Sequence, residues 1–435
     1  NPYDAIYTNR AWATDGDGIT RITYTFSSAN GNGDDYDGTP TSLFSSSQQT
    51  AMRAALTAIE RVTRIDFIET SASGAGQANL AMRQFNYDDP TILGHVSSLP
   101  GYPGYEIDID FGMYTGFNAY NPDNGDFTTL IHELGHALGL DHPHENGYGS
   151  DILIPSLDDE RATVMSYYNY VADSGNVFYV ETPQIYDIAV LQDKYGINTG
   201  YNSGNTTYDL SSASYQQYAG TLWDAGGTDT YDARGISSSL TIDLREGMDY
   251  ITHFGNANPG LYSNESFIWT AFGSNIENAY GGSGNDTIHG NDLANTLIGY
   301  SGNDTIIGYR GNDSINGHYG NDTVNGHYGN DYLRGGAGND TVRGGADNDT
   351  LRGDKGDDTI RGDKGNDAQW GDAGNDYLNG HEGADTLRGG AGNDEVRGGS
   401  ENDIVIGDGG NDTLKGDKGN DLLDGGAGRD ILYGG

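Results

Sequence analysis

Short segments in the first part of the chain alternate between hydrophobic and polar residues, and this alternation predicts strands. Residues 21–26 (Arg-Ile-Thr-Tyr-Thr-Phe) and 106–110 (Glu-Ile-Asp-Ile-Asp) change polarity at every position, as half-buried strands do. Residues 65–69 follow as another predicted strand. The segment before them has apolar positions at helical spacing, which predict a helix with one buried face: Met52, Ala55, Leu56, Ile59 and Val62.

Two further helices are predicted downstream. Apolar residues recur at i, i+3, i+4 and i+7 at Phe127, Leu130, Ile131, Leu134, Ala137 and Leu138. Later, Thr182 is a predicted N-cap with Pro183 at the first helical position, and that helix is expected to run to Gly196. Strands and helices in this order predict a mixed sheet with helices packed on it, which is an α+β arrangement.

From Gly281 to the end of the chain, the apolar positions follow a period of nine residues. The eighth position of each unit is aliphatic, beginning with Ile288 and Leu297, and only Gln369 interrupts the column. Each unit predicts six residues of glycine-rich turn ending in a carboxylate, followed by three residues of strand. A unit such as residues 335–343 is similar to the calcium-binding RTX nonapeptide repeat. A disordered Gly-Asp linker is the alternative, but a linker has no reason to place Ile, Leu or Val at every ninth residue.

The sixth position of each unit predicts calcium ligands. It is aspartate everywhere except at Asn295. Aspartates stacked at the inter-strand spacing of about 4.8 Å repel one another, and calcium removes that repulsion with ligands from carboxylates and turn carbonyls. The expected ligands are Asp286, Asp304, Asp313, Asp322, Asp331, Asp340, Asp349, Asp358, Asp367, Asp376, Asp385, Asp394, Asp403, Asp412, Asp421 and Asp430, with the turn glycines Gly282, Gly284, Gly299, Gly302, Gly335, Gly336 and Gly338.

The amino-acid composition limits the kinds of partner that the protein can bind. The 435 residues include 22 Lys plus Arg against 64 Asp plus Glu, for a formal charge of −42. Such a polyanion is repelled by nucleic acid and by anionic lipid, so we expect neither as a partner, and its natural partner is a cation. The absence of cysteine excludes disulfides, and no run approaches the eighteen or so apolar residues of a membrane span. We expect the protein to be a monomer. We also expect its mature form, because the chain begins Asn1-Pro2-Tyr3 without a signal-peptide core.

Residues 132–142 (His-Glu-Leu-Gly-His-Ala-Leu-Gly-Leu-Asp-His) carry the candidate chemistry. His132 and His136 project from one helical face and can share a metal ion, with Glu133 beside it. Gly139 can take positive φ, which ends the helix and lets His142 return as a third ligand. A His-x-x-x-His pair alone could arise by chance, but the complete pattern could not easily do so. Three protein ligands leave zinc one open position, which is typical of catalytic rather than structural zinc.

This pattern, followed by Val164-Met165-Ser166-Tyr167, resembles the metzincin metalloproteases, and Pro143 after the third histidine points to the serralysin branch. The resemblance implies a metzincin fold with Met165 beneath the three histidines. It implies that Tyr167 can bind zinc or swing to the transition-state oxyanion, and that residues 92–97 form an edge strand that holds substrate by strand addition. The alternatives are that Met165 is an ordinary core residue and Tyr167 one more of the 31 tyrosines.

Residues 223–232 are similar to the junction segment of serralysins, which implies calcium ligation by Asp224, Asp229 and Asp232. We place the domain boundary within residues 200–225. The predicted division is a zinc metalloprotease domain at 1–215 and an all-β parallel β-roll at 216–435, with the regular repeats at 281–435.

These patterns predict a secreted zinc-dependent endopeptidase that acts on proteins or peptides, with one catalytic zinc ion and several structural calcium ions. Glu133 is the expected general base. Extracellular location and contact with a type I secretion machinery follow from the family resemblance. The alternative is a calcium-binding surface-layer or adhesin-like protein with an inactive protease-like domain. The intact Glu133 argues against it, since a purely structural site has no need of that carboxylate.

Overall fold

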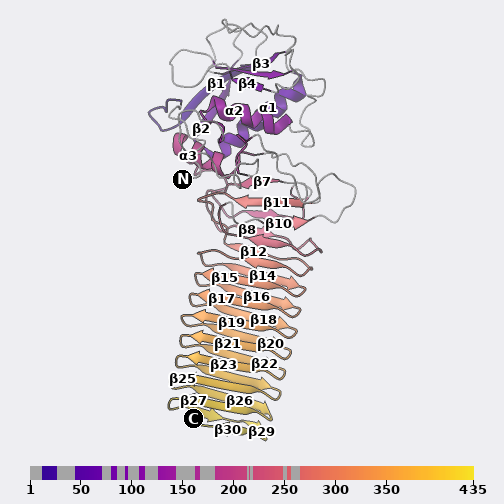
Figure 1. Ribbon diagram of the computed structural model, residues 1–435, viewed down its shortest axis with the longest axis vertical. Helices are drawn as coiled ribbons and strands as arrows, with labels where there is room; N and C mark the ends of the chain where they lie inside the picture. Colours follow the sequence, from indigo (N-terminus) through magenta and orange to yellow (C-terminus); the bar gives the residue numbers. More distant parts are fainter. Residues whose placement is uncertain are drawn as a thin grey trace.

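The computed structural model shows an elongated molecule, with a mixed α/β region at the N-terminal end and a long solenoid of strands at the C-terminal end (Figure 1). Within the chain, the structure describes residues 12–26, 45–70, 80–85, 94–96, 107–112, 126–143, 162–166, 182–212, 215, 219–247, 252–255 and 265–435.

The N-terminal region contains a five-stranded sheet in the order β2-β1-β3-β5-β4. Neighbouring strands are parallel, except that β4 runs antiparallel to β5 at the sheet edge. The strands predicted at 21–26, 65–69 and 106–110 are confirmed, and the edge strand predicted within 92–97 is present as β4. The bounds are β1 (Thr20–Phe26), β2 (Ile65–Glu69), β3 (Leu80–Phe85), β4 (Gly94–Val96) and β5 (Ile107–Gly112).

Three helices accompany this sheet: α1 (Ser46–Val62), α2 (Asp126–Ala137) and α3 (Ile185–Tyr195). Helix α1 begins with a capping box, in which the Ser45 hydroxyl accepts the Gln48 amide and the Gln48 side chain accepts the Ser45 amide. Four residues of its predicted apolar face, Met52, Ala55, Leu56 and Ile59, are buried with apolar residues of α2, α3 and the sheet in one core, and Val62 is buried in a second cluster. This core fixes the position of α2, which carries the zinc motif.

The predicted start of α3 is wrong. The helix begins at Ile185, two residues beyond Pro183, and its N-cap is Gln184 rather than Thr182. The reason is the carboxylate of Asp187 in the first turn, which accepts the Gln184 backbone N–H at 2.8 Å and so fixes where the helix starts. The predicted end is confirmed, because Gly196 follows the last helical residue with a φ of 80°.

The C-terminal region is a β-roll made of two sheets, whose strands pair in parallel except that β10 runs antiparallel to β9 and β11. The first roll sheet has 13 strands and the second has 12. Near the junction the strands are β6 (Thr207–Asp209), β7 (Ala219–Leu222), β8 (Thr230–Asp232), β9 (Thr241–Asp243), β10 (Thr252–Gly255), β11 (Glu265–Thr270) and β12 (Asn278–Tyr280). The repeats supply β13 (Thr287–His289), β14 (Thr296–Ser301), β15 (Thr305–Arg310), β16 (Ser314–Tyr319), β17 (Thr323–Tyr328), β18 (Tyr332–Ala337), β19 (Thr341–Ala346), β20 (Thr350–Lys355), β21 (Thr359–Lys364), β22 (Ala368–Ala373), β23 (Tyr377–Glu382), β24 (Thr386–Ala391), β25 (Glu395–Ser400), β26 (Ile404–Gly410), β27 (Thr413–Lys418), β28 (Leu422–Asp424), β29 (Ala427–Gly428) and β30 (Ile431–Tyr433).

Consecutive nine-residue units alternate between the two roll sheets, so each strand pairs in parallel with the strand eighteen residues later. Val324 lies opposite Val342 in the first sheet, and Leu333 lies opposite Leu351 in the second. The predicted aliphatic column forms the core between the sheets, where its members from Ile288 to Leu414 are at most 1% exposed. The parallel β-roll predicted from the nine-residue period is therefore confirmed.

Most strands in the repeats are longer than predicted. They contain six residues rather than three, because each continues into the first three residues of the following unit, as in β17. The glycine that opens a unit permits this. A Cβ atom at Gly326, for example, would collide with Oδ2 of Asp331, so only glycine lets the strand pass beside the carboxylate.

The two regions meet through apolar and polar contacts. Val62, Ile188, Trp223 and Ala271 form a shared buried cluster. In β7, the Thr221 amide donates to Thr182 Oγ1 at 3.2 Å. Strand β6 pairs with β8 and so belongs to the second roll sheet. It lies within residues 200–225, where the domain boundary is predicted, but before residue 216, the predicted first residue of the roll.

Candidate functional site

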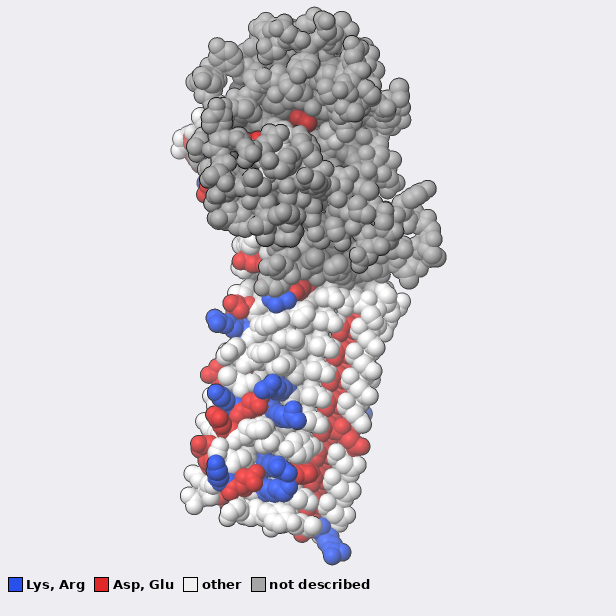
Figure 2. Space-filling view, viewed as in Figure 1, with Lys and Arg blue, Asp and Glu red and all other residues white. Residues whose placement is uncertain are grey.

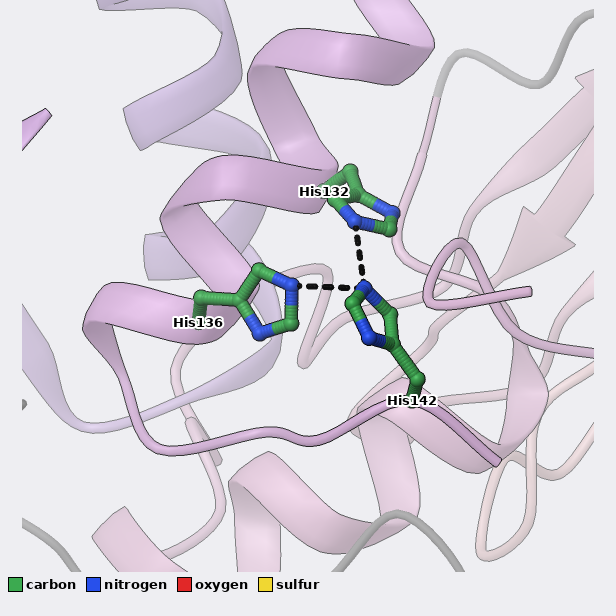
Figure 3. A group of neighbouring side chains, drawn as sticks. All are labelled: His132, His136 and His142. Atoms are coloured by element: carbon green, nitrogen blue, oxygen red, sulfur yellow. Dashed lines mark hydrogen bonds between the residues drawn. The ribbon is translucent and has the colours of Figure 1, made fainter. Parts of the chain in front are cut away.

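Three histidines converge at one end of α2. His132 and His136 lie on the helix, and His142 lies on the chain that returns after it (Figure 3). The Nε2 atom of His142 is 3.1 Å from Nε2 of His132 and 2.9 Å from Nε2 of His136. One ligand nitrogen from each histidine lies within 4.8 Å of the other two, which is a spacing that can hold a metal ion.

The opposite ring nitrogens explain which form these histidines take. Nδ1 of His132 lies 2.6 Å from the Val164 carbonyl oxygen, and Nδ1 of His136 lies 2.9 Å from the Leu140 carbonyl oxygen. A carbonyl oxygen can only accept, so each Nδ1 carries the proton and each Nε2 is left with a lone pair. Both lone pairs lie about 3 Å from Nε2 of His142, and a single proton on that atom can satisfy only one of them, whereas a cation shared by the three nitrogens satisfies both. The donor set therefore fits a bound metal ion, and neutral imidazole nitrogens suit zinc.

Two glycines shape this arrangement. Gly139 has a φ of 84°, and the Leu140 amide donates back to the Gly135 carbonyl, so the helix ends and the chain turns toward His142. Gly135 leaves room for a neighbour from elsewhere in the chain, since a Cβ atom there would lie 2.7 Å from the Met165 sulfur. Met165 is fully buried against this side of α2. The methionine expected beneath the histidines thus packs directly behind them.

Glu133 follows His132 on α2 and is largely buried, with 6% of its surface exposed. The adjacent backbone turn is fixed in part by Asp141, whose carboxylate accepts the His142 amide at 2.9 Å. Tyr167 lies outside the described residues, so its proposed part in zinc or oxyanion binding stays a prediction. The side chains of β4 are likewise outside the described part, and its role in holding substrate stays a prediction as well.

The aspartates at the sixth position of the repeats form two ladders along the roll. In each ladder, an aspartate amide donates to Oδ1 of the aspartate eighteen residues later, as Asp322 does to Asp340 at 2.7 Å. Figure 2 shows an acidic stripe along one edge of the roll. The second oxygen, Oδ2, is buried without a hydrogen-bond partner in the described part of the chain at Asp304, Asp313, Asp322, Asp331, Asp340, Asp349, Asp358, Asp367, Asp376, Asp385, Asp394, Asp403, Asp412 and Asp421.

Burial makes the charged form of these carboxylates costly. It raises the pKa of Asp322 to about 6, of Asp340 to about 7 and of Asp349 to about 8. A row of buried oxygens that lack partners is the environment that a divalent cation satisfies. The residues therefore fit calcium, with one oxygen of each carboxylate holding the backbone and the other left for the ion.

The exceptional unit at Asn295 supports this interpretation. Its Oδ1 accepts the Asn291 amide at 2.9 Å, and its Nδ2 donates to the Glu277 carbonyl at 3.1 Å. Both ends of the amide are satisfied by the protein itself. The unit with asparagine thus lacks the unpartnered oxygen that the aspartate units from Asp304 to Asp421 have in common.

The turn glycines predicted as ligands lie where successive turns of the roll touch. Gly302, Gly336 and Gly338 have positive φ values of 112°, 118° and 136°, which other residues rarely adopt. A Cβ atom at Gly281 would meet the Gly299 carbonyl oxygen at 2.6 Å, and one at Gly284 would meet the Ser238 carbonyl oxygen at 2.6 Å. Glycine here lets backbone carbonyls of one turn approach the next.

The junction brings together two of the three predicted aspartates. Asp224 and Asp229 are fully buried, and burial, with the nearby charges of Asp224 and Glu277, raises the pKa of Asp229 to about 7. The Asp229 amide donates to Glu277 Oε2 at 2.8 Å. Asp232 instead pairs with the Arg234 guanidinium at 2.6 Å. Sequence reasoning missed Glu277, because it is 48 residues from Asp229 and carries no repeat signal.

Comparison with known sequences agrees with both halves of this description. Residues 273–368 and 370–435 match the sequence model of the RTX calcium-binding nonapeptide repeat. The residue between the two stretches is Gln369, which also interrupts the aliphatic column. The calcium-binding repeats predicted from the nine-residue period are therefore confirmed.

The chain is similar to metallopeptidase AprA of Pseudomonas marginalis, with 30% identity over 64% of the chain and 62% of the relative. It is 32% identical to a serralysin of Proteus mirabilis over 62% of the chain and 59% of the relative, and 36% identical to serralysin C of Dickeya chrysanthemi over 40% and 39%. The chain thus spans about three fifths of the length of the first two. The predicted resemblance to serralysins is confirmed.

No helix in the described part of the chain is both long enough and apolar enough to cross a membrane.

Proposed function

We propose, from the homology to serralysins and the RTX repeats, that this chain is a secreted zinc-dependent endopeptidase stabilised by a calcium-binding β-roll. The observation that carries the proposal is the convergence of three Nε2 atoms from His132, His136 and His142, the first two of which have their lone pairs free for a metal ion. Zinc held there supplies a Lewis acid that polarises the scissile carbonyl and acidifies a water molecule.

The residues of the chain then perform the proton transfers and the positioning. Glu133 takes the proton of the attacking water and passes it to the leaving amine, first as base and then as acid. The Tyr167 hydroxyl helps to hold the developing oxyanion. Strand β4 offers its outer edge to an extended peptide, since it has a neighbour on only one side among the described strands. Substrates are therefore proteins or peptides bound in extended form.

Calcium fits the role of a folding switch for the roll. The partnerless carboxylate oxygens oppose folding when the ion is scarce and are satisfied when it is abundant. A chain of this kind stays expanded in the cytosol, passes through an export machinery, and folds outside. We also propose a division into a protease domain at 1–215 and a roll at 216–435. The pairing of β6 with β8 favours a boundary a few residues earlier.

A calcium-binding surface-layer or adhesin-like protein remains the second candidate, in which the first domain is inactive. Both candidates share the roll and differ in the zinc region. The buried Glu133 next to His132 favours the enzyme, because burying a carboxylate is costly and is retained more readily where it does chemistry.

Casein hydrolysis separates the two candidates. The calcium-loaded chain should release peptides from casein, and 1,10-phenanthroline should abolish the activity while 1,7-phenanthroline, which does not chelate, leaves it intact. Added zinc should restore it. No hydrolysis by the zinc-loaded protein would rule out the enzyme and leave the adhesin-like alternative.

A further inference from the structure

The buried carboxylate of Asp187 lies outside the mechanism above, yet it contacts the turn next to the zinc ligands. Asp187 is in the first turn of α3 and is 1% exposed. Its Oδ1 accepts the Thr163 hydroxyl at 2.5 Å, and its Oδ2 accepts the Val164 amide and the Gln184 amide, each at 2.8 Å. One side chain therefore ties the start of α3 to the segment that carries Met165.

The contacts of Asp187 suit its charged form. Thr163 Oγ1 accepts the Met165 amide at 3.1 Å and donates its own proton to Asp187, so that both carboxylate oxygens accept. Burial raises the pKa of Asp187 to about 6, and the three donors offset part of that rise, so the carboxylate is charged at neutral pH.

The peptide between Val164 and Met165 connects this charge to the metal site. Its N–H, from Met165, donates to Thr163 Oγ1, whose hydroxyl donates to Asp187, and its C=O, from Val164, lies 2.6 Å from Nδ1 of His132. Hydrogen bonds in such a chain polarise one another, so the carboxylate at its end strengthens the carbonyl as an acceptor. The Val164 N–H belongs to the preceding peptide, and its bond to Asp187 fixes the position of the residue. A stronger acceptor at Nδ1 holds the imidazole in one tautomer and makes Nε2 a better metal ligand.

We propose that Asp187 is a positioning residue for the zinc ligand His132, acting through Thr163 and the peptide between Val164 and Met165. This inference rests on the proposed function. It deepens it by assigning to one histidine a support that comes from a different helix, 55 residues away along the chain. Asp187 has no part in the proton transfers, so its effect is expected first on the metal and only through the metal on turnover.

The competing explanation is that Asp187 only caps α3. A pure cap would change the stability of the fold without changing how tightly the folded protein holds metal. A positioning residue changes metal affinity in protein that is fully folded. The two roles therefore differ in a quantity that can be measured.

The test compares Asp187→Asn with a matched control on the same helix, Asp193→Asn, where the carboxylate is exposed. Zinc affinity is measured by chelator competition in saturating calcium, and the visible spectrum is recorded after replacement of zinc by cobalt. Circular dichroism and thermal melting show what fraction is folded. Asp187→Asn should bind zinc about 10 to 100 times more weakly and shift the cobalt bands, whereas Asp193→Asn should match the wild type in both.

Thr163→Val provides a graded second variant, because it removes one of the three donors to Asp187 and keeps the carboxylate. Its zinc affinity should fall by less than that of Asp187→Asn. If Asp187→Asn does not fold, Thr163→Val decides alone. Zinc affinity and cobalt spectrum indistinguishable from the control in the folded variant would overturn the proposal. A wild-type protein that binds no zinc or cleaves no casein would instead overturn the proposed function.

Discussion

The zinc region and the roll hold their candidate ligands in opposite ways. Each candidate zinc-binding histidine occurs once, and two of the three are oriented by backbone carbonyls from different places, Val164 for His132 and Leu140 for His136. Each roll aspartate is instead held by a copy of itself eighteen residues away, as Asp322 is by Asp340. A single-copy site thus depends on long-range packing, whereas a repeated site takes its support from its neighbours.

This difference predicts how each region responds to damage. The loss of one group at the zinc site removes something that no other residue supplies. The loss of one carboxylate in the roll leaves a long row of similar aspartate units in place. Only a change that acts on all of these units at once, such as removal of calcium, should affect the roll as strongly as a point substitution affects the zinc site.

Calcium removal is expected to have the largest effect and tests the comparison most directly. In excess chelator the roll should lose its strand signal and expand, because the row of buried carboxylate oxygens is no longer satisfied. Folding should return as calcium rises to about 10⁻⁴ to 10⁻³ M, the range of extracellular modules. Circular dichroism and small-angle scattering of the full chain measure both changes. Strand content that persists unchanged in chelator would refute this account of the ladder.

Glu133→Ala is expected to lower kcat/KM by about 10² to 10⁴-fold while zinc stays bound, since only the proton carrier is lost. Peptide hydrolysis and elemental analysis measure the two quantities. The matched change in the roll is Asp340→Asn, which should leave the strand signal in calcium nearly intact, as the natural Asn295 unit indicates. Activity of Glu133→Ala within tenfold of the wild type would remove Glu133 from the mechanism.

The response to pH should also separate the regions. Burial raises the pKa of Asp331 to about 6 and that of Asp358 to about 8, above the value of about 3.9 in an unfolded chain. The folded, calcium-free roll therefore binds protons more tightly than the unfolded chain. This contribution to stability is complete below about pH 4 and is lost as pH rises through 6 to 8.

In chelator, where the roll is expected to be unfolded near neutral pH, part of the strand signal should accordingly return when pH falls from 8 to 5. With calcium present the trend should reverse, and the free energy of unfolding should fall over the same range, because ion binding requires the charged carboxylates. Circular dichroism in chelator and denaturant titrations in calcium, both at fixed ionic strength, measure the two trends. A calcium-free roll with the same strand signal at pH 5 and pH 8 would show that the ladder aspartates do not titrate in this range.

The smallest expected effect is at Gln369, whose side chain is fully buried in the aliphatic column between Leu351 and Leu387. Its Nε2 donates to the Asn379 carbonyl, but its Oε1 has no hydrogen-bond partner in the described structure. Gln369→Leu should raise the stability of the calcium-bound roll by about 1 kcal/mol, through apolar burial and removal of that unpaired oxygen. The control, Leu387→Gln, should lower it. Calorimetry in calcium measures both, and a lower melting temperature for Gln369→Leu would contradict the prediction.

Much of the fold follows from local pattern. The strand at 65–69 and the buried face of α1 are as the alternation and the helical spacing predict. The start of α3 was mispredicted because propensity favours Pro183 at a first turn, whereas Asp187 bonds both Gln184 and Val164 and so fixes the start later. The start of α3 therefore depends on a contact with Val164, which is too far from α3 in the sequence for a local pattern to include it.

The candidate site, too, could be predicted only where local sequence determines it. The sequence motif identifies the three histidines, because the spacing of metal ligands along a helix can be read from residue types alone. His132 and His136 are oriented by the backbone carbonyls of Val164 and Leu140. Every residue has such a carbonyl, so the residue types do not reveal which ones take part. Glu277 was missed for a related reason, since only the folding of the junction brings it to Asp229.

The hydrogen bonds of the aspartate ladders all point the same way, and those of a neighbouring row of asparagines point the other way. From Asp286 through Asp412, the amide at the sixth position of each unit donates to a carboxylate eighteen residues later in the chain. The amide of Asn321 instead donates to the Asn303 side chain eighteen residues earlier, and Asn339 donates to Asn321 in the same way. Each turn of the roll therefore gives an acceptor to the turn before it and another to the turn after it. A partly coiled roll has finished acceptors and unfilled donors at both of its ends, so a new turn can be added from either side.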